Sequence, residues 1–101
     1  MIKEINEQEF ELVRKENIAL VDFYATWCNP CKALRPVLEE IDNKNLLHIY
    51  SLDVDNANNI CEEFEISSIP CLILLKDGKE VSRSIGFKPI NLIEEWIKEN
   101  L

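Results

Sequence analysis

Hydrophobic residues in the first half of the chain follow the periods of two kinds of element, amphipathic helices and buried strands. Asn6 followed by Glu9 has the form of a helix cap, and apolar residues on one face continue that helix to about Lys15. A nearly continuous apolar run over 18–24 predicts a strand that is buried on both faces. A second helix follows, with a kink expected at Pro36 and an apolar face made by Leu34, Val37, Leu38 and Ile41.

The second half of the chain predicts a strand, a short helix, a hairpin and a closing helix. Asp77-Gly78 marks the hairpin, because glycine accepts the positive φ that such turns require. The expected elements are strands over 46–54, 71–75 and 80–85 and helices over 58–64 and 89–100. Early alternation of helices and strands implies parallel strands, and the hairpin implies an antiparallel edge. The sequence therefore predicts an α/β fold in one domain, 1–101, with a mixed central sheet flanked by helices on both faces.

Composition and charge argue against several classes of function. A formal net charge of −8 disfavours a nucleic-acid partner, because nucleic-acid-binding proteins concentrate Lys and Arg against the phosphate backbone. No apolar run approaches the roughly 18 residues of a membrane span. The acidic residues that follow Met1 do not resemble a secretory signal. We therefore expect no nucleic-acid partner, no membrane insertion and a cytoplasmic location.

Four cysteines, at positions 28, 31, 61 and 71, raise three alternatives: a disulfide scaffold, a metal site and redox chemistry. The chain has enough apolar residues to fold without disulfides, which disfavours a scaffold. A zinc site with four ligands is a minor alternative, because Cys61 and Cys71 are too far apart for the usual close pair. The single histidine, His48, lies among strand-like residues. We expect no metal and favour redox chemistry.

The pair Cys28 and Cys31 falls where the buried strand turns into the second helix. The first turn of a helix has backbone N–H groups without partners and partial positive charge, so a thiolate there is stabilised and its pKa falls. Residues three apart on a helical turn have Cα atoms about 5 Å apart, which a disulfide tolerates. Pro30 has a φ compatible with this turn. The pair can therefore form a disulfide and open it with little backbone movement.

Residues 21–32 (Val-Asp-Phe-Tyr-Ala-Thr-Trp-Cys-Asn-Pro-Cys-Lys) resemble the active-site segment of thioredoxins. The resemblance extends over the whole chain, since matches to the family's kink proline, cis-proline, hairpin turn and groove glycine occur at Pro36, Ile69-Pro70, Asp77-Gly78 and Gly86. It implies a thioredoxin fold and a protein-disulfide reductase whose redox-active disulfide is Cys28–Cys31, with no bound cofactor. It also implies a monomer that takes electrons from a thioredoxin reductase and passes them to disulfide-containing client proteins.

The same resemblance assigns roles to four residues. Cys28, nearer the solvent, attacks a client disulfide, and the more shielded Cys31 resolves the mixed disulfide. Asp22 aligns with the family's buried aspartate and is the candidate base for Cys31, the alternative being a hydrogen-bonded structural acid. Pro70 is expected to be cis and to face the cysteines, where adjacent backbone can pair with an extended client strand.

An apolar patch around Cys28 is the expected client-docking surface. Its members are Tyr24, Trp27, Val54, Ile69, Ile85 and Gly86. Core packing is the alternative for each of these side chains, and Trp27 is the one that we expect to be exposed.

The two remaining cysteines are expected to have structural roles. Cys61 lies on the short helix, where buried free cysteine behaves as a small apolar residue. Cys71 directly follows the expected cis-proline, and strand alternation points it away from whatever Pro70 faces. A modifiable thiol close to the redox pair is the alternative for Cys71.

Two positions depart from the family pattern. Asn29 replaces the usual glycine between the cysteines, and together with Pro30 it is expected to tune the reduction potential. Ser51 stands where many thioredoxins carry a lysine that faces the buried aspartate. Loss of that cation is expected to raise the pKa of Asp22 and to make the resolving step more dependent on pH.

Two other functions are open at the level of sequence. An oxidase or isomerase of extracytoplasmic disulfides would use the same fold with a more oxidising potential. The motif Trp-Cys-x-Pro-Cys-Lys and the missing signal disfavour it. A binding module would use the fold as a stabilising subunit, and retention of both Cys28 and Cys31 together with Asp22 disfavours that as the sole role.

Overall fold

Five strands form one mixed sheet in the computed structural model, which describes residues 1–101. The strands are β1 (Lys3–Ile5), β2 (Ile18–Tyr24), β3 (His48–Asp53), β4 (Cys71–Lys76) and β5 (Lys79–Ile85). Their order across the sheet is β1-β3-β2-β4-β5. The first three strands in this order run parallel, β4 runs antiparallel to β2, and β5 runs antiparallel to β4. The expected mixed sheet with an antiparallel hairpin is therefore confirmed.

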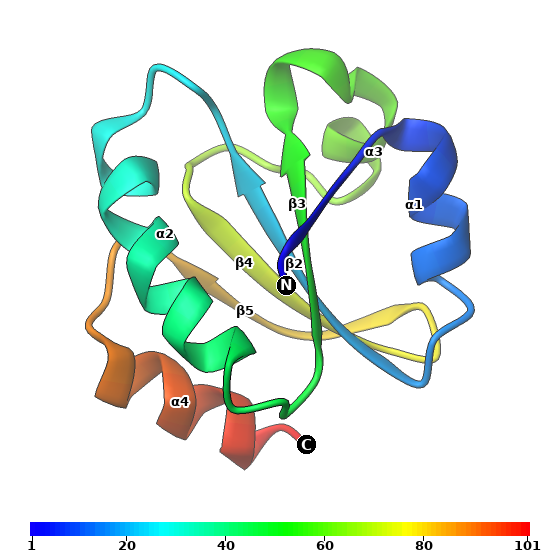
Figure 1. The fold of residues 1–101 in the computed structure, drawn as a ribbon. Coiled ribbons are helices and arrows are strands. Elements are labelled where there is room, and N and C mark those ends of the chain that lie inside the picture. Colours follow the sequence, from blue (N-terminus) through cyan, green and yellow to red (C-terminus); the bar gives the residue numbers. More distant parts are fainter.

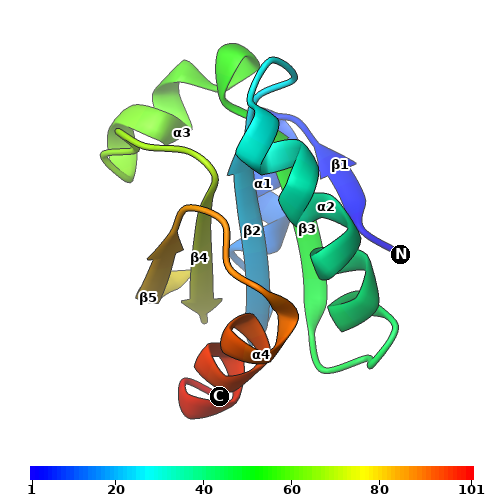
Figure 2. The ribbon, with the colours of Figure 1, turned by 90° about the vertical axis from the view of Figure 1, so that its left-hand side faces the viewer.

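Helices cover both faces of the sheet. They are α1 (Glu7–Val13), α2 (Asn29–Asp42), α3 (Asn58–Glu63) and α4 (Ile90–Glu99), and a 3-10 turn, η1 (Val54–Asn56), precedes α3. Figure 1 shows α2 and α4 on one side of the sheet and α1 and α3 on the other. The turned view of Figure 2 places α2 and α4 in front of β2 and α1 behind it. None of these helices has both the length and the apolar content needed to cross a membrane.

The alternation of side chains along β2 and β4 divides the apolar residues between two cores. The core under α1 and α3 receives Ala19, Val21, Phe23, Cys71, Ile73 and Leu75 from these strands. The core under α2 and α4 receives Leu20, Leu72 and Leu74. The expectation of a strand buried on both faces is confirmed, because residues 19–23 of β2 are all buried.

Most element boundaries lie within two residues of those predicted, and one strand is missed altogether. β1 has only three residues, too few to show a period, and it forms by parallel pairing with β3 from Lys3 opposite Tyr50 to Ile5 opposite Leu52. The strand expected over 46–54 is shorter at both ends. Val54 begins η1 instead, because the Asp53 carboxylate accepts a hydrogen bond from the Asp55 backbone N–H at 2.9 Å.

The start of α1 and the hairpin turn follow the predicted local chemistry. The Asn6 side chain accepts from the Glu9 N–H at 2.8 Å, and the Glu9 carboxylate accepts from the Asn6 N–H at 3.0 Å. Gly78 has a φ of +79°, and a Cβ at this position would lie 2.6 Å from the Arg14 carbonyl oxygen. The hairpin therefore needs glycine both for its backbone angle and for its close contact with the end of α1.

We expect Leu38→Ala to lower the free energy of unfolding by about 2–5 kcal/mol, because the Leu38 side chain is fully buried between α2 and the sheet. The matched control is Leu12→Ala on α1, where the leucine is 62% exposed and the expected change is within about 0.5 kcal/mol. Urea unfolding of the two variants beside the parent protein measures both values. Equal losses for the two leucines would contradict the assignment of Leu38 to the core.

Candidate active site

A disulfide joins Cys28 and Cys31 where the chain leaves β2 and enters α2. The Cα atoms are 5.3 Å apart, as expected for residues that are three positions apart on a helical turn. Cys28 is the N-cap residue of α2, and its Sγ accepts the backbone N–H of Cys31 at 3.2 Å. Pro30 lies in the first turn, where its missing N–H costs no hydrogen bond. The sulfur of Cys28 thus occupies the position of a helix-capping acceptor.

This capping position distinguishes the two cysteines chemically. A thiolate at Cys28 is stabilised by the N–H of Cys31 and by the positive end of the α2 dipole. Exposure does not distinguish them, since each cysteine is 6% exposed in the disulfide form. The expectation that Cys28 lies nearer the solvent is therefore wrong for this state of the protein. The hydrogen bond from the Cys31 N–H holds Sγ of Cys28 against the first turn of α2.

Asp22 places a carboxyl group in the interior beneath α2. The residue is 4% exposed, its Oδ2 accepts from the Ser51 hydroxyl at 3.4 Å, and its Oδ1 has no hydrogen-bond partner in the protein. Desolvation by burial raises the pKa of Asp22 to about 7, with a smaller upward effect from Glu4. The positive charge of Arg35 and the Ser51 hydrogen bond act in the opposite direction. A carboxyl group with this pKa exchanges its proton near neutral pH.

Arg35 is the site residue that the sequence analysis did not identify. The usual lysine is absent at Ser51, and Arg35 of α2 supplies a cation near Asp22 instead. Its Nη1 donates to the Ser51 hydroxyl at 3.0 Å. The available signal was spacing, since Arg35 follows Cys31 by four positions and therefore lies on the same face of α2. The expected rise in the pKa of Asp22 is nevertheless present.

A small pocket connects this interior to the surface between the end of β2 and α2. Its volume is about 280 Å³, and it is lined by Asp22, Tyr24, Ala25, Thr26, Cys31, Lys32 and Arg35. The carboxyl group and the second cysteine therefore line the same space. Protons can enter or leave Asp22 on this side without passing through either apolar core.

Three of the six predicted docking residues contact the cluster that holds the disulfide. Tyr24, Val54 and Ile69 pack against the cluster that contains both cysteines. The Ile69–Pro70 peptide bond is cis, and the Gly86 N–H donates to the Pro70 carbonyl oxygen at 2.8 Å.

Two apolar side chains of this region are open to solvent. Trp27 is 65% exposed, as expected, and its Nε1–H donates to the Asp55 carboxylate at 2.8 Å. Ile85 is 49% exposed at the end of β5, directly opposite Cys71 of β4. Trp27, next to Cys28 in the chain, and Ile85, at the end of β5, are therefore the predicted docking side chains that the structure leaves exposed. Asn29 is exposed as the first residue of α2.

Cys61 and Cys71 belong to the core on the far side of the sheet from α2. Cys71 is buried there, and Cys61 packs against the same core. Burial raises the pKa of both thiols, with further contributions at Cys61 from neighbouring carboxylates that include Glu7. The interpretation of Cys71 as a packing residue that points away from the redox pair agrees with this placement. No three or more His, Cys, Asp or Glu side chains are grouped so as to hold a metal ion.

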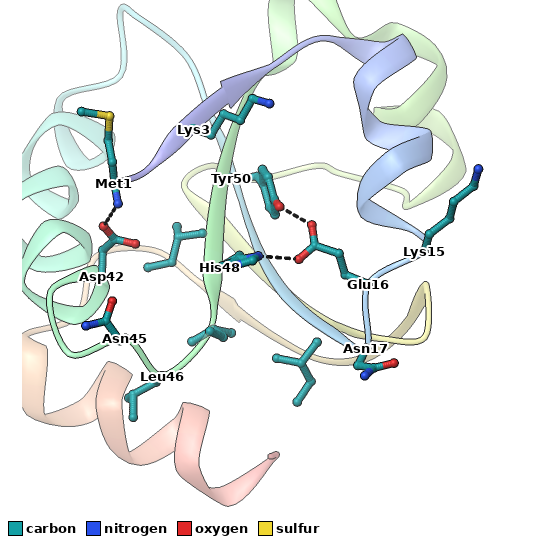
Figure 3. Close-up of a pocket in the computed structure, with 13 residues that line it drawn as sticks. Met1, Lys3, Lys15, Glu16, Asn17, Asp42, Asn45, Leu46, His48 and Tyr50 are labelled. Atoms are coloured by element: carbon teal, nitrogen blue, oxygen red, sulfur yellow. Dashed lines mark hydrogen bonds and ion pairs between the residues drawn. The ribbon is translucent and has the colours of Figure 1, made fainter.

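A larger cavity, of about 910 Å³, lies at the opposite end of β2 and contains no cysteine. Figure 3 shows the Glu16 carboxylate between two partners at its rim. It accepts from the Tyr50 hydroxyl and pairs with Nδ1 of His48 at 2.8 Å. His48 is therefore an exposed residue that links β3 to the segment before β2, and it does not approach the disulfide.

Comparison with known proteins gives one consistent family. A family profile described as Thioredoxin matches residues 1–99. The protein named Thioredoxin from Bacillus subtilis (strain 168) is 39% identical over 102 aligned residues, which cover 99% of this chain and 98% of the relative. The Thioredoxin of Staphylococcus saprophyticus is 40% identical over the same coverage of both chains. That of Staphylococcus aureus (strain Mu50) is 38% identical, again over 99% of this chain and 98% of the relative.

We expect Asp22→Asn to stabilise the oxidised protein at alkaline pH and to leave its stability nearly unchanged near pH 4. The pKa of Asp22 is raised from 3.8 in the unfolded chain to about 7 in the fold, so the folded state loses stability as pH rises through this interval. The difference corresponds to at most about 4 kcal/mol above pH 7. Urea unfolding at about pH 4 and at about pH 8 measures it.

The control for this prediction is Glu39→Gln, which removes an exposed carboxyl group on α2. Its stability is expected to follow that of the parent protein at both pH values. A gain for Asp22→Asn that is the same at both pH values would show that packing, and not ionisation, causes the effect.

Proposed function

Since this chain belongs to the thioredoxin family and is a thiol–disulfide oxidoreductase, we propose that Cys28 is its nucleophile and Cys31 its resolving thiol. The observation that carries this assignment is the hydrogen bond from the Cys31 N–H to Sγ of Cys28 at the start of α2. Of the two sulfurs, the one that caps the helix is the better stabilised as a thiolate, and the thiolate is the attacking species.

Reduction of a client disulfide then proceeds in two exchanges. The Cys28 thiolate attacks one client sulfur, a bond forms between them, the client S–S bond breaks, and the released client thiolate takes up a proton. Cys31 gives up its proton and attacks Sγ of Cys28, which forms the Cys28–Cys31 disulfide and releases the second client thiolate. Two electrons pass from the chain to the client.

Asp22 is proposed as the base that accepts the proton of Cys31. The two residues line the same small pocket, and the pKa of Asp22 is raised by burial to about 7. A base with a pKa near the working pH is the most effective for proton transfer. The orphaned Oδ1 of Asp22 supports this role, because a purely structural buried carboxyl group is usually fully hydrogen-bonded.

Client docking is proposed on the apolar patch around the disulfide. Its residues are Tyr24, Trp27, Val54, Ile69, Ile85 and Gly86. The backbone next to Pro70 is proposed to pair with an extended client segment, as in strand addition. Support comes from the exposure of Trp27 and Ile85 and from the contact of Val54 and Ile69 with the cysteine cluster.

The domain organisation, location, oligomeric state and redox partner of the protein are also proposals. We propose one domain over residues 1–101, acting as a cytoplasmic monomer that is recharged by a thioredoxin reductase and needs no bound cofactor besides its own disulfide. Family membership supports the reductase partner. Cys61 and Cys71 are free thiols in the structure, which is typical of proteins in reducing compartments. Asn29 and Pro30, between the two cysteines, are proposed to tune the reduction potential.

Cysteine replacement tests the assignment of nucleophile and resolving thiol. With insulin as client and dithiothreitol as reductant, we expect Cys28→Ser to abolish catalysed reduction. Pre-reduced Cys31→Ser, freed of dithiothreitol before insulin is added, is expected to stop after the first exchange and to accumulate a mixed disulfide between Cys28 and the client, visible by mass spectrometry. The matched control is Cys61→Ser, which leaves both exchanges intact. Accumulation of the mixed disulfide in Cys28→Ser instead would reverse the two roles.

Equilibration with glutathione tests the direction of electron flow. A reductase requires a Cys28–Cys31 pair that is more reducing than glutathione, so in a buffer of both glutathione forms, with the reduced form in large excess as in the cytosol, we still expect most of the pair to be present as the disulfide. Thiol alkylation after acid quenching measures the ratio of the two forms. A pair that remains mostly reduced in this same glutathione buffer, in which reduced glutathione is in large excess, would instead favour an oxidase or isomerase.

A further inference from the structure

A chain of hydrogen bonds leads from the surface of α2 to the carboxyl group beneath the disulfide. Arg35 Nη1 donates to Oγ of Ser51 at 3.0 Å, and Ser51 donates to Oδ2 of Asp22 at 3.4 Å. Ser51 is fully buried and stands directly opposite Asp22 in the parallel register of β2 and β3. Arg35 is half-buried, and no carboxylate lies within ion-pair distance of it. The Ser51 hydroxyl is therefore its only side-chain hydrogen-bond partner.

The chemistry of these groups fixes which one donates and which one accepts in each of the two hydrogen bonds. A guanidinium group has donors only, so the Ser51 oxygen must accept from Arg35. A hydroxyl group that accepts on one side keeps its own proton for another partner, and the Asp22 carboxylate is the acceptor within reach. A hydrogen bond donated to a carboxylate favours its ionised form. Arg35 thus acts on Asp22 both by its charge and by fixing the orientation of the Ser51 hydroxyl.

We propose that Arg35 is a positioning residue for disulfide exchange, which orients the Ser51 hydroxyl toward Asp22 and thereby keeps this carboxylate available as a base for Cys31. The inference rests on the proposed role of Asp22. Cys28, Cys31 and Arg35 follow one another at spacings of three and four residues, so the face of α2 that carries the reacting sulfurs also carries the guanidinium.

Few other charged groups near Asp22 affect its ionisation. The titratable and charged groups on its side of the sheet come from β1, β2 and α2, and they are Glu4, Tyr24, Cys31, Lys32 and Arg35. Cys71 of β4 interacts with it only electrostatically, from the opposite face of the sheet. Glu4 opposes Arg35, because its negative charge raises the pKa of Asp22. Glu4 is held in place by the Tyr24 hydroxyl at 2.8 Å. Lys32 lines the same pocket and makes no side-chain hydrogen bond to Ser51 or Asp22.

Carboxyl-carbon NMR of the oxidised protein tests the inference directly, because it follows the ionisation of Asp22 without relying on activity. We expect Arg35→Met, which keeps an unbranched apolar stem, to move the titration midpoint of Asp22 upward by about one pH unit. Ser51→Ala is expected to move it in the same direction. The control is Lys32→Met, which removes a cation from the same pocket and is expected to leave the midpoint nearly unchanged. An unchanged midpoint in Arg35→Met overturns the inference.

The double variant Arg35→Met/Ser51→Ala tests whether Arg35 acts through Ser51. If it does, the two shifts are not additive, because each single variant already breaks the same chain of hydrogen bonds. Fully additive shifts would mean that the charge of Arg35 acts alone, and the positioning role would be rejected.

The pH profile of client reduction connects this measurement to catalysis. A base whose pKa rises from about 7 to about 8 is about fivefold less ionised at pH 7, so we expect Arg35→Met to slow the resolving step about fivefold there and much less at pH 9. If Asp22→Asn leaves the pH profile unchanged, the proposed base is wrong. In that case the NMR midpoint of Arg35→Met still shows whether Arg35 controls Asp22. A shifted midpoint with a normal pH profile in Arg35→Met rejects its role in exchange.

Discussion

Because β2 is paired along both edges, with β3 on one side and β4 on the other, its side chains can point only to the two faces of the sheet. Val21 and Phe23 therefore enter the core under α1 and α3. Asp22, between them, must point to the opposite face, where α2 covers it. A slip of one residue in this register would exchange the two faces and remove the carboxyl group from the disulfide. Strand pairing thus decides the chemistry of the site as much as the cysteines do.

Burial of the Asp22 carboxyl group favours proton exchange at the site but lowers the stability of the fold. Desolvation brings the pKa of Asp22 close to neutrality, which suits proton exchange, and the same desolvation makes its ionised form unfavourable inside the protein. Two extensive apolar cores, one on each face of the sheet, hold the strands in place around it. Arg35 of α2 and Ser51 of β3 reduce this cost, since both favour the charged form of Asp22. The site is therefore a balance between burial and local polar contacts.

Long hydrophobic patterns made the larger elements predictable from sequence. The continuous apolar run of β2 and the helical period of α2 each extend over enough residues to be recognised, and they fix the position of the disulfide. β1 was not predictable in this way, because its three residues form a strand only through pairing with β3. The exposure of the cysteines was also misjudged, since it depends on the bonded state of the sulfurs.

Arg35 shows a different limit of sequence reasoning. Its relation to Ser51 joins a helix to a strand sixteen residues away, and no local pattern reports which residue of α2 reaches across. Comparison with the family pattern at Ser51 correctly indicated a missing lysine, but it could not reveal that a cation from another element takes its place. Tertiary contacts of this kind follow from the packing of α2 on the sheet and become visible only in three dimensions.

The positions of the other two thiols, Cys61 and Cys71, bear on how many electrons one molecule can pass to a client. Cys61 and Cys71 contact one core on the far face of the sheet, and burial raises the pKa of both thiols, which lowers the fraction present as the reactive thiolate. Of the four cysteines, only Cys28 and Cys31 are joined in a disulfide. Each molecule delivers two electrons and keeps none in reserve. A client with two disulfides must therefore react with two reduced molecules, or with one molecule that is reduced again in between. The supply of reductant then limits the rate at which such clients are reduced.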